Sequence, residues 1–174
     1  MKEFLEILKY VLPSLVVLLT VWIMGKQFFG NWESQMRNSS NQSLRKTTLP
    51  IKLQAYERIS LFLERITVDS LLVREKDNAL NTRSFHQKLL ASIRAEYEHN
   101  LSQQIYVSSE AWQIVKNAKE GVIKMVNMAA MEVNPDDPAI ELSKKIIDLQ
   151  MEINNSPSQV ALEFINKEVK NILN

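Results

Sequence analysis

The chain has 174 residues, 45% of them hydrophobic and 24% charged, and its 21 basic and 20 acidic side chains give a net charge of +1. This size allows one folded domain plus an appended segment, and the near-zero charge argues against nucleic-acid binding, which usually needs a strong basic excess. The absence of cysteine excludes disulfides, thiolate metal sites and thiol nucleophiles, while 3 glycines and 5 prolines favour long helices over a turn-rich β fold.

An uncharged apolar stretch lies near the N-terminus, from Tyr10 to Gly25. As a helix it covers roughly 24 Å at about 1.5 Å per residue, and flanking lysine and aromatic side chains extend it toward the roughly 30 Å of a bilayer core. We therefore predict a transmembrane helix with its core at 10–26, inside an anchor of residues 1–30. The residues expected to form and flank this anchor are Lys9, Tyr10, Pro13, Trp22, Lys26, Phe28, Phe29 and Trp32.

A cleaved signal peptide is the alternative, because Lys2 and Lys9 precede the apolar run. The anchor is favoured, since no small-x-small cleavage site follows the run. An exported helical domain, released after cleavage, therefore stays an alternative. Lysine and arginine are more frequent after the apolar run than before it, which places the C-terminal domain on the cytoplasmic side.

Residues 31–48 are rich in asparagine, serine and glutamine and show no apolar period, so they are expected to form a polar linker or stalk. Folded structure is expected to resume at Thr48–Pro50, where proline suits the first turn of a helix. The predicted soluble helical domain spans residues 49–174.

Apolar residues at helical spacing run through this domain in five stripes, with a docked connector at 71–73 between the first two. The stripes span 53–66, 85–105, 112–129, 139–153 and 160–172. The expected helix starts are Asn81 or Thr82, Ser108, Pro138 and Ser156. Such wide stripes must pack against one another to leave water, so the predicted fold is all-α, an N-terminal transmembrane helix followed by a compact bundle of four or five helices.

The densest polar cluster lies in the second helix of the predicted bundle. Glu96 and His99 form a Glu-x-x-His pair on one helix face, as in di-iron helical bundles. Such a site needs a second pair and two further glutamates on facing helices, and His86 has no glutamate at this spacing. A metal-binding bundle, acting as an enzyme or a sensor through Glu96 and His99, is therefore an alternative. The favoured interpretation is a partner surface formed by Arg94, Glu96, Glu98, His99, Asn100, Gln103 and Gln104.

Enzyme motifs are missing from the sequence. It contains no glycine-rich phosphate-binding loop and no serine in a nucleophile elbow, and the Asp136–Asp137 pair is explained by helix capping. We therefore expect no enzyme activity and no cofactor.

Two segments carry a resemblance to a known group of proteins: YERISLFLERI at 56–66 and IRAEYEHNLSQQIYVS at 93–108. Together with the N-terminal anchor, they resemble a family of small uncharacterised single-pass membrane proteins from Bacteroidota, and the likeness extends over most of the chain. The resemblance implies a bacterial inner-membrane location and a domain of unknown function. It implies no activity, cofactor or substrate.

These features favour a non-catalytic, membrane-anchored interaction protein, an accessory subunit or adaptor of a larger membrane complex. The expected partners are the membrane, crossed once, and a protein of unknown identity, with no nucleic acid. A homo-oligomer is the alternative, and it would form through the helical domain because the anchor has no Gly-x-x-x-Gly face.

Overall fold

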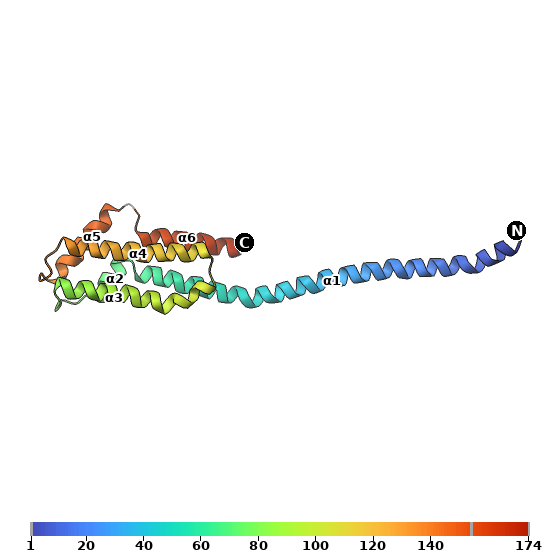
Figure 1. The fold of residues 1–174 in the computed structure, drawn as a ribbon, viewed down its shortest axis with the longest axis horizontal. Helices are drawn as coiled ribbons and strands as arrows, with labels where there is room; N and C mark the ends of the chain where they lie inside the picture. Colours follow the sequence, from blue (N-terminus) through green and yellow to red (C-terminus); the bar gives the residue numbers. More distant parts are fainter. Residues whose placement is uncertain (1, 154, 174) are drawn as a thin grey trace. The chain divides into compact units, whose positions relative to one another are not determined.

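The computed structural model describes residues 2–153 and 155–173, and it describes the side chains of Tyr10 and of residues 13–26, 46–153 and 155–173. The predicted all-α class is confirmed (Figure 1): within the described residues, the only β pairing is an isolated bridge between Asn81 and Pro138. The helices are α1 (Lys2–Arg65), α2 (Val68–Glu75), α3 (Thr82–Asn100), the 3₁₀ helix η1 (Leu101–Ile105), α4 (Ser109–Met131), α5 (Ala139–Glu152) and α6 (Pro157–Leu173). The chain divides into two compact units, Met1–Leu49 and Pro50–Asn174.

Helix α1 corrects one local prediction, because no helix starts at Thr48–Pro50. The helix is continuous from Lys2 to Arg65, so residues 31–48 are helical throughout. Residues 31–49 contain neither glycine nor proline, and Pro50 removes only one backbone donor, which a long helix can accommodate. Among the described residues, none of the helices combines the length and the apolarity that a bilayer crossing requires.

The second unit is a helical bundle centred on α4, which contacts α3, α5 and α6. In Figure 1, α3 and α4 run antiparallel, and α6 returns along α4 toward the C-terminus. The last turns of α1 join this core through Ile59, Phe62 and Leu63. The predicted stripes supply most of the buried side chains, which include Phe85, Leu89, Ile93, Val115, Val122, Val126, Leu142, Ile146 and Ile165; in the last stripe Val160 is exposed, and its neighbour Ala161 is buried.

The start signals of two helices are confirmed in atomic detail. The Asn81 side chain accepts a hydrogen bond from the Ser84 amide at 3.0 Å, and the Ser108 hydroxyl accepts one from the Ala111 amide at 3.0 Å. Each bond satisfies an amide that has no partner within its own helix.

Three element boundaries differ from the sequence-based expectation. The connector expected at 71–73 is part of α2, and the hydroxyl of its N-cap Thr67 accepts from the Ser70 amide at 3.4 Å. Pro138 is the N-cap of α5 and not its first helical residue. The second stripe is too long, because the backbone changes to the 3₁₀ helix η1, where Leu101 and Ile105 are exposed.

Gly121 of α4 packs against the start of α6. A Cβ atom at this position would lie 2.8 Å from Cγ and 2.9 Å from Cβ of Pro157, the first residue of α6. Contacts this short force a shift, and the proline ring cannot rotate away because it is fixed to the backbone. The absence of a side chain at Gly121 therefore allows Pro157 to lie directly against α4.

Replacing Gly121 by alanine is expected to lower the free energy of unfolding by about 1 kcal/mol. Alanine gains about 1 kcal/mol of helix propensity, but overpacking costs about 1–3 kcal/mol, so the overpacking term prevails. Urea unfolding of the full chain in detergent, followed by circular dichroism, measures the difference. In a Pro157→Gly background, which lacks both contacted atoms, Gly121→Ala should become stabilising. An unchanged sign in that background would contradict the assigned contact.

Candidate docking groove between α1 and α3

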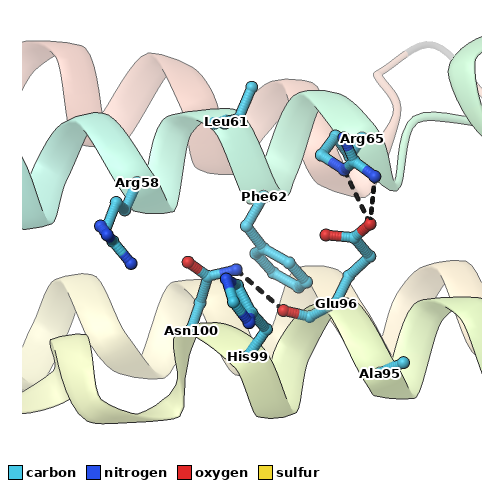
Figure 2. A pocket seen from close by; sticks show the side chains of 8 residues that line it. All are labelled: Arg58, Leu61, Phe62, Arg65, Ala95, Glu96, His99 and Asn100. Atoms are coloured by element: carbon cyan, nitrogen blue, oxygen red, sulfur yellow. Dashed lines mark hydrogen bonds and ion pairs between the residues drawn. The ribbon is translucent and has the colours of Figure 1, made fainter.

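A groove of about 570 Å³ opens between the last turns of α1 and the C-terminal half of α3 (Figure 2). Helix α1 contributes residues at spacings of three and four, and helix α3 does the same, so each set lies on one helix face. The lining residues are Arg58, Leu61, Phe62, Arg65, Ala95, Glu96, His99 and Asn100.

An ion pair closes one end of the groove. Nε and Nη2 of Arg65 lie 2.7 Å and 2.5 Å from the same carboxylate oxygen, Oε1 of Glu96. The guanidinium of Arg74 lies nearby and donates to the Arg65 carbonyl oxygen at 2.9 Å, which satisfies an acceptor at the end of α1. Arg65 is therefore held at both its side chain and its backbone.

The floor of the groove combines a ring and an amide. The ring of Phe62 is buried and lies 6.0 Å from the ring of Tyr97, centroid to centroid. Asn100 is 7% exposed, and its Nδ2 donates to the Glu96 carbonyl oxygen at 2.8 Å. This bond fixes the carboxamide, and Figure 2 shows its oxygen on the side that faces Arg58. The floor is thus rigid, with an apolar and a polar part.

Two nitrogen-bearing side chains at the groove have no partner. Arg58 and His99 are both exposed, and neither forms a hydrogen bond or an ion pair within the described part of the chain. Since Glu96 neutralises Arg65, the charge of Arg58 is left without a counterion in the groove. The groove is therefore electropositive.

The structure brings together three of the seven residues predicted for a partner surface. Glu96, His99 and Asn100 line the groove, whereas Arg94 and Glu98 are exposed on other faces of α3. The remaining two, Gln103 and Gln104, lie in η1 outside the groove, and Gln103 Nε2 donates to the Ser102 hydroxyl at 3.1 Å. The surface predicted from one helix is thus only half of the site.

The other half comes from α1 and was missed. Arg58, Leu61 and Arg65 share one face of that helix at spacings of three and four, beside the predicted core residue Phe62. The sequence does contain a signal for the α1 side of the groove, because Arg58 and Arg65 flank Leu61 next to the apolar stripe of residues 53–66. That signal does not say which helix lies opposite.

A metal site at Glu96 and His99 gains no support from this geometry. The Oε1 oxygen of Glu96 is bound by Arg65. Across the described residues, no group of three or more histidine, cysteine, aspartate or glutamate side chains is arranged to hold a metal ion.

A second polar arrangement joins three elements of the bundle. Buried Tyr56 of α1 donates its hydroxyl to Oε1 of Glu168 in α6 at 2.9 Å and accepts the Ser108 amide of the α4 cap at 3.4 Å. Burial, followed by the bond to the Glu168 carboxylate, raises the pKa of Tyr56 from 10.0 to about 12. The other oxygen, Oε2 of Glu168, is buried and has no hydrogen-bond partner in the described structure. These hydrogen bonds connect α1 with α6 and with the N-cap of α4, and neither Tyr56 nor Glu168 lines the groove.

The residues predicted for the anchor are only partly described. Tyr10, Pro13, Trp22 and Lys26 are exposed on α1, and the Lys26 amine lies 5.4 Å from the ring centroid of Trp22. Lys9, Phe28, Phe29 and Trp32 lie outside the residues whose side chains the structure describes.

Comparison with known proteins identifies a family. No curated protein and no solved structure matches the chain. The model of a family described as a family of unknown function (DUF7935) matches residues 2–172. The predicted resemblance to an uncharacterised family is confirmed at that level, while the bacterial phylum and the single membrane span stay predictions. Because the match covers nearly the whole chain, the protein belongs to the DUF7935 family.

Proposed function

We propose that the protein is a non-catalytic, membrane-anchored interaction protein, an accessory subunit or adaptor, whose helical bundle docks a protein partner in the groove between α1 and α3. The observation that carries this proposal is the uncompensated Arg58 beside the exposed Leu61, in a groove whose walls are already fixed. Arginine next to apolar surface is typical of the residues that contribute most to protein interfaces.

The membrane part of the proposal rests on the exposed face of α1. From Leu15 to Met24 the large apolar side chains are exposed, with Leu18 at 71% and Trp22 at 64%, and no charged residue interrupts them. Contiguous apolar surface of this kind marks contact with lipid or protein. We assign it to a single-pass anchor in a bacterial inner membrane, with the bundle on the cytoplasmic side. The pairing of Lys26 with Trp22 suits a headgroup boundary.

The membrane anchor and the docking groove support the same function. An anchor confines the bundle to a thin layer beside the membrane, where the effective concentration of other membrane proteins is high. An open groove with a single uncompensated arginine offers modest affinity, and confinement makes modest affinity sufficient.

Co-purification tests the docking function. The tagged full-length protein is solubilised from native membranes in a gentle detergent and recovered with its associated proteins, which mass spectrometry identifies. We expect a defined partner with the wild type and its loss in an Arg58→Ala, His99→Ala variant. Arg94→Ala, Glu98→Ala is the matched control, because it changes two exposed polar residues of α3 outside the groove. Recovery of the wild type alone would show that the proposed function is wrong.

Alkaline carbonate extraction tests the anchor. The full-length protein is expected to stay in the membrane pellet, and a Val17→Asp, Leu18→Asp variant is expected to move largely to the supernatant. An aspartate near the centre of a membrane helix costs about 2.5–3.5 kcal/mol, so two such residues offset much of the insertion energy. The control is Leu61→Asp, which places the same charge at an exposed leucine of the groove and should remain in the pellet. Wild type in the supernatant would contradict the anchor.

A further inference from the structure

We propose that the groove binds the carboxylate of a glutamate or aspartate in an acidic segment of the partner protein, and that an apolar neighbour of that residue packs on Leu61. This inference rests on the proposed docking function and names the chemistry of the partner. The juxtaposition that carries it is an unpaired guanidinium, an exposed imidazole and an exposed leucine around one rigid groove.

The charges in the groove favour one anion. Arg65 and Glu96 cancel each other, so the net positive charge is that of Arg58, with the His99 ring on the opposite wall. Figure 2 shows the Arg58 guanidinium extending from α1 toward α3, across the groove from His99. A carboxylate placed between them can take two parallel hydrogen bonds from the guanidinium, the geometry that arginine offers best.

The groove has the size and the rigidity that such a contact needs. Its volume of about 570 Å³ lies within the roughly 300–1,000 Å³ of typical binding pockets, so it admits a side chain together with part of its neighbour. The Arg65–Glu96 pair and the Asn100 bond hold these three side chains in place, so they lose little conformational freedom when a ligand binds.

The same charges disfavour an anionic lipid surface. Four exposed charged residues adjoin lining residues in sequence: Glu57, Glu64 and Glu98 are acidic, and Arg94 is basic. These neighbours carry three negative charges and one positive charge, so the groove is not part of a broad basic surface. Binding to an anionic membrane depends on clusters of basic residues, whereas a single carboxylate on a protein segment needs only the one unpaired arginine.

Leu61 supplies the apolar half of the recognition. It is 58% exposed and lines the groove on the same helix face as Arg58 and Arg65. An acidic residue alone would leave this leucine in water, whereas an apolar neighbour would cover it. The segment that fits is thus acidic and apolar in adjacent side chains, and a purely acidic tail fits less well.

Site-specific photo-crosslinking in native membranes tests the inference. The photoreactive residue p-benzoyl-phenylalanine replaces Leu61 in the full-length protein, and mass spectrometry maps the crosslinked peptide of the partner. We expect an aspartate or glutamate within a few residues of the crosslink. Arg58→Glu should lower the crosslink yield roughly tenfold or more, because two carboxylates would then face each other in the interface. Changing the partner's acidic residue to arginine should restore the yield with Arg58→Glu.

The controls separate the inference from the function on which it rests. Arg94→Glu makes the same charge change on an exposed residue outside the groove and should leave the yield unchanged, and an unchanged urea midpoint shows that Arg58→Glu is folded. A crosslinked partner whose yield does not depend on Arg58 overturns the carboxylate inference and leaves the docking function in place. No partner by crosslinking or co-purification overturns both. Binding of purified protein to phosphatidylglycerol vesicles through Arg58, without a protein crosslink, overturns the inference in favour of lipid.

Discussion

Replacing Phe85 by alanine is expected to lower the free energy of unfolding by about 3–5 kcal/mol, the usual cost of removing a buried aromatic ring. Phe85 is 1% exposed and lies in the first turn of α3, where the amide of Ala139 also donates to the Leu80 carbonyl oxygen at 3.1 Å. Both the lost burial of the ring and the cavity left behind act in the same direction. The backbone pairing around the site limits how far α3 and α5 can move to fill that cavity.

Urea unfolding of the full chain measures this loss. The midpoints of wild type and variant are compared where the two unfolding curves have the same m-value, because the shift then reports a change in stability alone. Phe85→Leu keeps most of the volume and should cost less than the alanine substitution. Val73→Ala serves as the control, since Val73 is highly exposed on α2 and should change stability by less than about 0.5 kcal/mol. A loss below about 1 kcal/mol for Phe85→Ala would mean that the ring is not part of the cooperative core.

The core could be predicted because it follows from local spacing. Residues such as Leu63, Leu89 and Val122 recur at helical intervals, and burying them against one another is the dominant favourable term in folding. The caps at Asn81 and Ser108 could be predicted for the same reason, since a cap acts on amides within its own first turn.

The groove could not be predicted in full because it depends on which helices are neighbours. The Arg65–Glu96 pair joins residues 31 apart in sequence, and the Tyr56–Glu168 bond joins residues 112 apart. Periodicity assigns a residue to a face of its own helix, but it does not say which helix faces it. Arg58 therefore carries no functional signal of its own in the sequence, whereas the density of polar residues in α3 indicates a site on that helix alone.

Pro50 shows a different failure, in which a local preference was overridden. Proline often opens a helix, and the preceding polar run predicted a boundary there. A single missing backbone donor does not end α1, since the flanking residues continue the hydrogen-bond ladder on both sides. The boundary between the two compact units nevertheless falls between Leu49 and Pro50, and the buried side chains of the second unit begin at Ala55.

Replacing Tyr56 by phenylalanine is expected to lower the free energy of unfolding by about 2–3 kcal/mol near pH 7. The ring volume is kept, so the loss comes from the hydroxyl, which donates to the Glu168 carboxylate at 2.9 Å. Hydrogen bonds to charged groups contribute about 1.5–3 kcal/mol. The variant also removes the tyrosine partner of Glu168 Oε1. Because Oε2 is already buried without a hydrogen-bond partner, both carboxylate oxygens then lack the tyrosine hydroxyl.

A double-mutant cycle identifies the bond as the cause. If Tyr56 acts through Glu168, then Tyr56→Phe should cost much less in a Glu168→Leu background, because no buried carboxylate is left unpaired there. Tyr106→Phe is the matched control, since Tyr106 is exposed and the same atom is removed. Equal losses for Tyr56→Phe in both backgrounds would rule out the assigned coupling.

The same hydroxyl gives stability a pH dependence at the alkaline end. The pKa of Tyr56 is about 12 in the folded protein, against 10.0 for an unperturbed tyrosine. Above pH 10 the unfolded chain loses this proton while the folded chain keeps it, so the contribution is complete below pH 10 and is lost as the pH rises toward 12. The wild type should therefore lose about 1–3 kcal/mol more than Tyr56→Phe over this range. Urea midpoints of both proteins, measured at intervals from pH 10 to 12, test this expectation. An equal fall in midpoint for the two proteins would contradict the raised pKa of Tyr56.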